Sequence, residues 1–406
     1  MSRVPRIRFK GFEEDWEQRK LGEIAERIVR KNEKLESTLP LTISAQYGLI
    51  DQNEFFDKRI ASKDVRGYYL IKKGEFAYNK STSVDAPFGA IKRLDKYKNG
   101  VLSTLYILFK VIDDTSTCSD YLVTYYFTDL WHKGIQSIAA EGARNHGLLN
   151  IAPNDFFETM LSIPLNVSEQ KKVGGFFISL DHLITLHQRK LEKLKIIKKS
   201  MLENLFPQNG EKTPKIRFSG FTKDWEQRKL GEMYTQLVER NIELLPFKKI
   251  LSVSTMTYKG DGNGAAEESL SSYKRLRVGD IAFEGHTSKD FRYGRFVLND
   301  TGDGIMSPRF SALRPISVMP IKFWKYYIHY EPIMKKILVN STKSGTMMNE
   351  LVVEEFLKEI LLVPEEHEQQ KIGRFFNGID HLITLHQSKL EKLQKIKKSM
   401  LECMFI

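Results

Sequence analysis

The side chains in this sequence that could bind a ligand lie in short polar loops, and the chemistry they suit is hydrogen bonding. Polar and basic side chains can bond the edges of bases and the oxygens of phosphates. Candidates follow matching strand-like runs in both halves of the chain, although any single one could be an ordinary solvated loop residue. They are Ser44, Gln46, Tyr47, Lys80, Ser81, Thr82, Arg144, Asn145 and His146, then Ser254, Thr255, His286, Thr287, Ser288, Lys289, Arg292, Lys343 and Thr346.

No catalytic motif accompanies these loops. The sequence has no GxxxxGK[ST] phosphate loop, no strand followed by GxGxxG, no HExxH and no [ND]PP[YF] motif typical of amino-methyltransferases. The glycine-rich run at 260–264 favours a flexible loop over a cofactor cradle. The nine histidines are scattered, and no His/Cys cluster has the spacing of a metal site. We therefore expect no catalytic residue, cofactor or metal in this chain.

Length and composition favour an intracellular protein with two or more domains. The 406 residues exceed one typical domain. The two cysteines lack CxxC spacing, which fits a reducing compartment. The N-terminal residues are polar and basic and no run of eighteen apolar residues occurs, so we expect a cytoplasmic protein without membrane contact. The net charge of +12 suits a polyanion such as nucleic acid, although a lysine-rich solvated surface gives the same total.

The positioning elements come from an internal duplication. The head of the first half reads PRIRFKGFEEDWEQRKLGE from Pro5, and that of the second reads PKIRFSGFTKDWEQRKLGE from Pro214. The tails are equally alike: FFISLDHLITLHQRKLEKLKIIKKSMLENLF from Phe176 and FFNGIDHLITLHQSKLEKLQKIKKSMLECMF from Phe375. The middles between head and tail are dissimilar. The two head segments are predicted to have a structural role. Their aromatic residues should pack together in a cluster, and a helix should start at Trp16-Glu17.

Both tails are predicted to be long helices with a heptad seam. Seam positions alternate in spacing between four and three, which is the period of helices that wind around each other. The seam residues are Leu180, Ile184, His187, Leu191, Leu194, Lys198, Met201 and Leu205, then Ile379, Ile383, His386, Leu390, Leu393, Lys397, Met400 and Met404. In an antiparallel pair with His187 opposite Lys397, Lys198 falls opposite His386. We therefore predict an antiparallel coiled coil within one chain, with Ser168 as the N-cap of its first helix.

The two middles show the same order of weak strand and helix patterns. In the first, 39–44 predicts a strand, 68–81 a hairpin around Lys73-Gly74, 104–112 a strand and 119–138 a buried helix. In the second, the counterpart of the first strand is 247–254, that of the hairpin is 273–288 and that of the helix is 321–339. Final strands are expected at 161–164 and 361–364. The middles are therefore predicted to share one fold with different surfaces.

This organisation suits a reader of duplex DNA. Antiparallel helices that each follow a middle domain would hold the two domains apart in inverted orientation. Two such domains can read two half-sites about one helical turn apart, roughly 34–36 Å. Because the middles differ, the expected site is bipartite and asymmetric.

The whole chain resembles the specificity subunit of a type I restriction-modification enzyme. The residues that carry the resemblance are the two heads, the runs SEQKKVGGFF and HEQQKIGRFF that lead into LDHLITLHQ and IDHLITLHQ, and the IP or VP dipeptide before each run. The resemblance implies two target-recognition domains, two methylation subunits bound around the helices, and restriction subunits bound to that complex. It also implies that S-adenosylmethionine, ATP and Mg²⁺ are used by those partners, and that this subunit has no catalytic role.

The expected fold class is α+β, with two target-recognition domains related by internal duplication and separated by two long helices forming an antiparallel coiled coil. The expected boundaries are 1–166 for the first domain, 167–209 for the first helix and linker, 210–364 for the second domain and 365–406 for the second helix. The rival interpretation is a coiled-coil scaffold whose two end domains bind proteins. Steep loss of DNA affinity with salt would separate the two.

Overall fold

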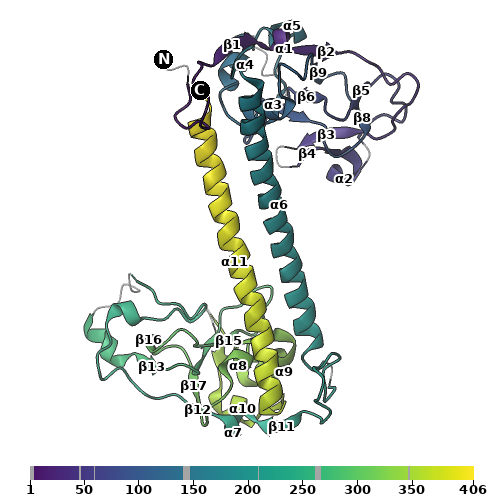
Figure 1. The fold of residues 1–406 in the computed structure, drawn as a ribbon. Helices are drawn as coiled ribbons and strands as arrows, with labels where there is room; N and C mark the ends of the chain where they lie inside the picture. The colour runs from purple at the N-terminus through teal and green to yellow at the C-terminus, as the bar shows by residue number, and fades with distance from the viewer. Residues whose placement is uncertain are drawn as a thin grey trace. The chain divides into compact units, whose positions relative to one another are not determined.

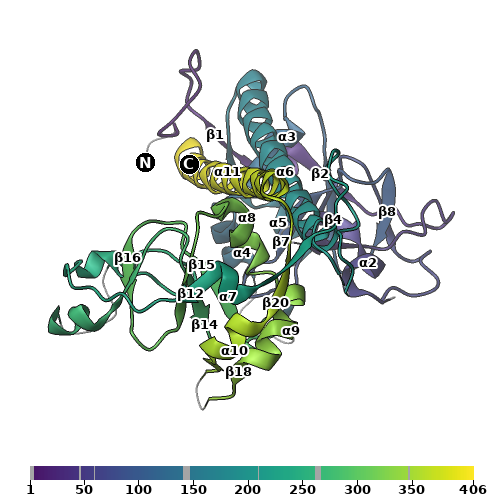
Figure 2. The ribbon, with the colours of Figure 1, turned by 90° about the horizontal axis from the view of Figure 1, so that it is seen from below.

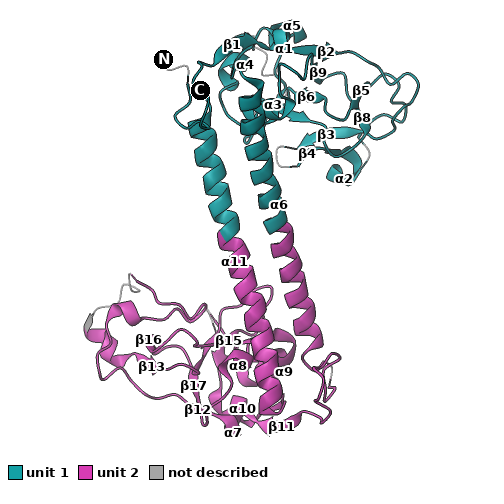
Figure 3. Ribbon diagram, in the orientation of Figure 1, with its two compact units in different colours: residues 1–187, 389–406 teal, residues 188–388 magenta. Residues whose placement is uncertain are grey.

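The structure is a computed structural model that describes residues 4–44, 47–58, 60–139, 147–208, 210–260, 267–345 and 348–406. The chain divides into two compact units (Figure 3). Unit 1 consists of residues 1–187 and 389–406, and unit 2 of residues 188–388. The division falls inside both long helices, so each unit contains part of each. The expected boundaries follow the sequence repeat and differ from this division, because they separate the helices from the domains.

Unit 1 is built around a four-stranded antiparallel sheet in the order β2-β9-β6-β7, with the further strand pairs β1–β10, β3–β4 and β5–β8 (Figure 1). Its strands are β1 (Glu17–Lys20), β2 (Ala25–Ile28), β3 (Leu41–Ser44), β4 (Gly48–Asp51), β5 (Tyr69–Lys72), β6 (Phe76–Asn79), β7 (Ala90–Arg93), β8 (Asn99–Leu102), β9 (Ile107–Val111) and β10 (Met160–Ile163). Its short helices are α1 (Leu21–Ile24), α2 (Gln52–Phe56), α3 (Ser119–Tyr125), α4 (His132–Ile138) and α5 (Pro153–Phe157).

Unit 2 repeats this plan with the sheet β12-β17-β14-β15 and the pairs β11–β20, β13–β16 and β18–β19. Its strands are β11 (Glu226–Lys229), β12 (Tyr234–Gln236), β13 (Lys274–Leu276), β14 (Ile281–Glu284), β15 (Arg295–Leu298), β16 (Gly304–Met306), β17 (Ala312–Pro315), β18 (Thr342–Lys343), β19 (Glu350–Leu351) and β20 (Ile360–Val363). Its helices are α7 (Leu230–Met233), η2 (Phe247–Lys249), η3 (Glu267–Ser272), α8 (Ile321–Tyr327), α9 (Glu331–Ser341) and α10 (Val353–Lys358). α9 and α10 lie side by side (Figures 1 and 2).

The long helices are α6 (Val167–Asn204) and α11 (Glu366–Met404). In unit 1, Phe177 of α6 contacts Phe405 and Asp181 of α6 pairs with Lys397, so numbers rise along one helix as they fall along the other. In unit 2, the contacts of Lys198 with Asp380 and of Phe206 with Phe376 follow the same rule. The predicted antiparallel packing is therefore present within each unit.

The predicted seam positions are all buried or half-buried on the two helices. Each seam lysine bonds an aspartate of the other helix. Lys397 Nζ lies 2.6 Å from Asp181 Oδ1 in unit 1, and Lys198 Nζ lies 2.6 Å from Asp380 Oδ1 in unit 2. The seam hypothesis, which placed a histidine opposite each lysine, did not foresee these aspartates.

The ends of the long helices complete the cores of the units. In unit 1, Met404 and Phe405 pack in the cluster of Trp16, Tyr121 and Phe177. In unit 2, Leu205 and Phe206 pack in the cluster that contains Trp225, Phe323 and Phe376. Burial removes these large apolar side chains from water and so stabilises the core of each unit.

The heads are tied to the starts of the long helices by matching buried ion pairs. Arg8 Nε donates to Glu169 Oε1 at 2.6 Å, and Arg217 Nε donates to Glu368 Oε1 at 2.7 Å. The side chains of Glu169 and Glu368 are 1% and 0% exposed. Each arginine also donates a second bond to the other carboxylate oxygen, so both pairs are bidentate.

Several local expectations were wrong. Trp16-Glu17 does not start a helix, because Glu17–Lys20 forms β1, which pairs with β10. This pairing joins the beginning of the first domain to its end. The run at 68–81 is not a hairpin: β5 pairs with β8, whereas β6 pairs with β7 and β9. Gly74, with φ +88°, turns the chain from one sheet to the other. Ser168 is not the N-cap, since α6 begins at Val167 and Asn166 Oδ1 accepts from the Ser168 amide at 2.9 Å.

The two buried helices are each broken in two. In unit 1 the break follows Tyr125, where Thr128 Oγ1 donates to the Tyr125 carbonyl at 2.7 Å and competes with the helix ladder. In unit 2 Pro332 lies in the first turn of α9, a position where its missing N–H costs nothing. The run at 247–254 forms η2 and isolated bridges rather than a strand. The strands expected at 39–44, 104–112, 161–164 and 361–364 are confirmed as β3, β9, β10 and β20.

Candidate nucleic-acid interface

In unit 1, Ser44 ends β3 and Tyr47 directly precedes β4. Ser44 is 8% exposed, and its hydroxyl accepts from the Tyr47 amide at 3.2 Å. The Ser44 hydroxyl is therefore already bonded within the protein. Tyr47 is 66% exposed, so its ring and hydroxyl are available to a ligand. Gln46 lies outside the described residues.

The segment that follows β6 contains Lys80, Ser81 and Thr82. Asn79 Oδ1 accepts from the Ser81 amide at 3.0 Å, and Thr82 Oγ1 donates to the Gly147 carbonyl at 3.2 Å. Lys80 Nζ donates to the Ile151 carbonyl at 3.4 Å, and burial, with a smaller effect of Arg27, lowers the pKa of Lys80. This strand end is therefore held against the segment at 147–151, and Ser81 is its exposed candidate. Arg144, Asn145 and His146 lie outside the described residues.

The equivalent strand end in unit 2 has different chemistry. Glu284 is the last residue of β14 and is 8% exposed. Its Oε1 accepts from the His286 amide at 3.2 Å and lies 2.5 Å from His286 Nδ1. Its Oε2 lies 3.5 Å from Nε of Arg295 on β15. A buried carboxylate thus fixes the ring of His286, whose side chain is 54% exposed.

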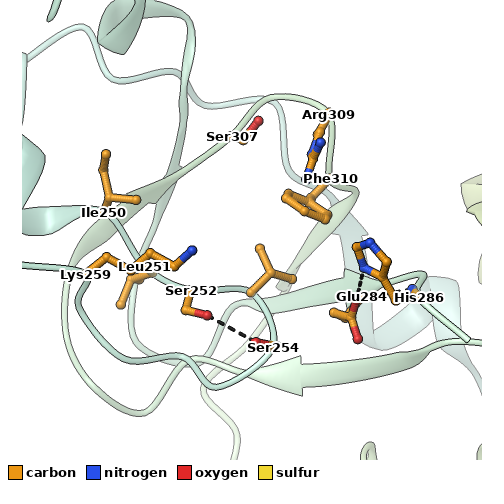
Figure 4. A pocket seen from close by; sticks show the side chains of 11 residues that line it. Ile250, Leu251, Ser252, Ser254, Lys259, Glu284, His286, Ser307, Arg309 and Phe310 are labelled. Atoms are coloured by element: carbon orange, nitrogen blue, oxygen red, sulfur yellow. Dashed lines mark hydrogen bonds and ion pairs between the residues drawn. The ribbon is translucent and has the colours of Figure 1, made fainter. Parts of the chain in front are cut away.

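His286 stands at the edge of a hollow of about 410 Å³ in unit 2 (Figure 4). The hollow is lined by hydroxyl groups and basic side chains together with apolar side chains. Its lining residues are Ile250, Leu251, Ser252, Val253, Ser254, Lys259, Glu284, His286, Ser307, Arg309 and Phe310. Two of the candidates, Ser254 and His286, therefore meet at one site, although 31 intervening residues separate them in the sequence.

The other candidates of unit 2 lie elsewhere. Thr255 Oγ1 bonds Thr257 Oγ1 at 2.7 Å on an exposed loop, and Ser288 Oγ accepts from the Phe291 amide at 3.1 Å. Thr255 and Ser288 are exposed, as are Thr287, Lys289, Arg292 and Lys343. Thr346 lies outside the described residues.

The structure adds polar residues that sequence reasoning missed. Glu284 could have been found, because GEFAYN (74–79) and GDIAFE (279–284) align and place it against Asn79. Ser307 could also have been found, because GVLS (100–103) and GIMS (304–307) align. Lys259 and Arg309 could not, since Arg309 stands where unit 1 has the apolar Leu105 and nothing in the sequence links Lys259 to this site. Lys274 Nζ donates to the Phe310 carbonyl at 2.6 Å and anchors the loop that contains Arg309.

Neither a membrane span nor a metal site is found within the described ranges. No helix there is both long and apolar enough to cross a bilayer. No group of three or more His, Cys, Asp or Glu side chains in those ranges could hold a metal ion.

The fold matches solved structures along almost its entire length. The S subunit of a type I restriction-modification system from M. genitalium superposes with a TM-score of 0.60 at 13% identity, covering 99% of each chain. The fold is that of a type I S subunit. The HsdS subunit from Thermoanaerobacter tengcongensis gives a TM-score of 0.45 at 16% identity over 96% of each chain. A chain from a structure on complex assembly and conformational transition of the type I R-M system gives 0.44 at 15% identity, covering 97% of this chain and 98% of that one.

The resemblance stated from the motifs and the S-subunit fold agree. The match covers both units and both long helices, so the α+β class with two duplicated domains and antiparallel helices is confirmed. No protein-family model matches the sequence, and neither does any curated protein.

Proposed function

We propose that this chain is the DNA-recognition subunit of a type I restriction-modification complex. It reads a bipartite, asymmetric site in duplex DNA, one half-site with each unit. The observation that carries the proposal is that both units use one scaffold, with sheets β2-β9-β6-β7 and β12-β17-β14-β15, yet end equivalent strands in different polar side chains. A duplicated scaffold with unlike polar ends is what two half-sites of different sequence require.

The partners follow from the same proposal. Two methylation subunits bind the chain, and restriction subunits join through that complex. S-adenosylmethionine serves the methylation subunits, and ATP and Mg²⁺ serve the restriction subunits, so this chain itself catalyses no reaction. It acts in the cytoplasm, where the DNA is. The net charge of +12 supports a polyanion as its ligand.

The decisive experiment is single-molecule sequencing of methylated adenines in cells that express this chain with its methylation partner. We expect methylation within one bipartite motif with two dissimilar halves and an unread spacer. Cells with the partner alone provide the control. Methylation that is absent, or that has no sequence preference, contradicts the proposal.

Salt dependence tests the rival scaffold function. For a DNA reader, affinity falls linearly with salt on a logarithmic scale, because phosphate contacts release counterions. A footprint should show two protected patches. A scaffold with protein-binding ends shows neither behaviour.

A further inference from the structure

The chain leaves β6 and β14 in the same backbone turn, but the polar side chain at the end of the strand differs between the two units. Asn79 faces Ala90 across the β6–β7 pair, and Glu284 faces Arg295 across the β14–β15 pair. Both side chains accept from the amide two residues later, at 3.0 Å in unit 1 and 3.2 Å in unit 2. The glycines at the turn back, Gly89 and Gly294, have φ of +78° and +84°. Since the backbone is conserved between the units, the side chains at this position are free to set specificity.

In unit 2 this turn presents a histidine in a fixed orientation. The carboxylate of Glu284 holds Nδ1 of His286 at 2.5 Å and is itself 8% exposed, so little water competes for it. When Nδ1 carries the proton that bonds the carboxylate, Nε2 of the neutral ring is an acceptor. Nε2 lies on the side of the ring away from Glu284, toward Phe310 and Arg309 (Figure 4).

Arg309 supplies the matching donors. Its guanidinium lies over the ring of Phe310, with Cζ 4.7 Å from the ring centroid, and Lys274 anchors the Phe310 carbonyl. In the part of the chain that the structure describes, Arg309 forms no ion pair, so its donors are available to a ligand. By contrast, Arg295, which faces Glu284 across the β14–β15 pair, contacts that carboxylate and donates to the Ser254 carbonyl at 3.3 Å.

The donors of Arg309 and the acceptor of His286, which line one hollow, correspond in type to the groups on the edge of one base pair. The major-groove edge of a G·C pair presents two acceptors, N7 and O6 of guanine, beside one donor, the N4 amino group of cytosine. Arg309 offers two donors in a fork, which is the commonest specific contact to guanine, and His286 offers one acceptor. An A·T pair would leave one Arg309 donor facing an amino group.

We propose that the hollow of unit 2 reads one G·C base pair in the major groove. Arg309 donates to N7 and O6 of guanine, and Nε2 of His286 accepts from the cytosine amino group. Glu284 is a positioning residue that fixes the imidazole. This inference rests on the proposed function and deepens it, because it names the base pair and the residues that select it.

The test uses the full chain in complex with its methylation partner and selects binding sites from randomised duplex DNA. The wild type should select a bipartite motif with a G·C pair in one half-site. Arg309→Ala should lose the preference at that single position, with affinity for the wild-type motif reduced about ten- to hundredfold and the other half-site unchanged. His286→Ala should weaken the preference at the same position. Lys223→Ala, which removes one exposed positive charge of unit 2 outside the hollow, should leave the motif unchanged.

A guanine analogue identifies the contacted atom. Replacing the selected guanine with 7-deazaguanine removes N7, and we expect it to weaken wild-type binding while the Arg309→Ala variant loses little further. Equal losses in both proteins would overturn the proposed contact. Melting temperatures of the variants show that each remains folded, and exposed His286 provides a second variant should Arg309→Ala disturb its loop.

The outcomes separate the two proposals. If the wild-type complex selects no motif, the proposed function itself fails. If the wild type selects a bipartite motif and Arg309→Ala lowers affinity equally for all sequences, Arg309 contacts a phosphate and the base-pair inference is overturned. An unchanged motif, or effects of Arg309→Ala and His286→Ala at different positions, also overturns it while the proposed function stands.

Discussion

Unit 1 and unit 2 hold the long helices with the same side chains, yet they end their central strands with different ones. The pairs Arg8–Glu169 and Arg217–Glu368 have the same bidentate geometry. Asp181–Lys397 and Asp380–Lys198 likewise match. At the strand ends, Asn79 of unit 1 occupies the position that Glu284 occupies in unit 2. The ion pairs that hold the long helices are thus the same in both units, while the polar side chains that end β6 and β14 differ. We expect stability to depend on the first set and specificity on the second.

The largest expected effects concern the helix ends in the two cores. Phe206 is 0% exposed and Phe405 is 6% exposed, and each contacts several aromatic rings. Phe206→Ala and Phe405→Ala should each lower the free energy of unfolding of their own unit by about 3–5 kcal/mol. Denaturant unfolding monitored by fluorescence measures this. Phe55→Ala is the control, because Phe55 is 48% exposed and its loss should change little. A negligible effect of Phe405→Ala would show that the two units are not built alike.

The buried ion pairs should rank next. Removing the carboxylate in Glu169→Gln or Glu368→Gln leaves an arginine without its partner in a largely buried place, at a cost of about 3 kcal/mol. The two variants should be destabilised to a similar extent, since the bidentate contacts are the same, although Arg8 keeps its bond to the Glu14 carbonyl at 2.6 Å. Glu158→Gln is the control, because its pair with Lys20 is exposed to solvent and its loss should change stability little. A several-fold difference between the two losses in thermal melts would contradict the equivalence.

Lys92 should make the stability of unit 1 depend on pH. It faces Ala77 across the β6–β7 pair, where unit 2 has Val297 facing Ala282. Burial, and then the charge of Lys397, lower the pKa of Lys92 to about 8, although Asp181 acts in the opposite direction. A lysine in an unfolded chain has a pKa of about 10.4. The folded state therefore disfavours the charged form, and the penalty is fully present below pH 8 and disappears above about pH 10.5.

Because the unfolded chain binds more protons in that window, stability from this residue rises with pH between about 8 and 10.5. Lys92→Val, which copies unit 2, should remove that rise and stabilise unit 1 by about 3 kcal/mol at pH 7. Unfolding of wild type and variant at several pH values between 7 and 10.5 measures the difference. Parallel pH profiles for the two proteins would contradict this account.

The smallest effects are expected at the seam aspartates. The side chains of Asp181 and Asp380 are 39% and 33% exposed, so solvent screens their bonds to Lys397 and Lys198. Asp181→Asn and Asp380→Asn should each cost about 0–1 kcal/mol, and less at high salt. Tyr326 donates a further bond to Asp380 Oδ2 at 2.7 Å, so the second change should cost slightly more. Melting at low and high salt separates the two variants.

The sequence by itself determined the architecture. Near-identical heads and tails revealed the duplication, and heptad spacing revealed long helices whose seam residues are buried or half-buried. These features could be predicted because periodicity is a local property of the chain. The absence of catalytic motifs and the motif resemblance indicated a recognition role, and the fold is the one that this resemblance implied.

Only the tertiary structure decided which strands pair and which polar side chains meet. Glu17–Lys20 became a strand because Met160–Ile163 lies beside it, and no local pattern contains that partner. Ser254, His286 and Arg309 come from three loops that long-range strand pairing brings to one hollow. A hydrogen bond such as that between Glu284 and His286 depends on how a turn is folded, whereas hydrophobic spacing depends only on neighbours along the chain. The side chains that we propose as the determinants of specificity therefore lie in the part of the molecule that sequence pattern alone does not fix.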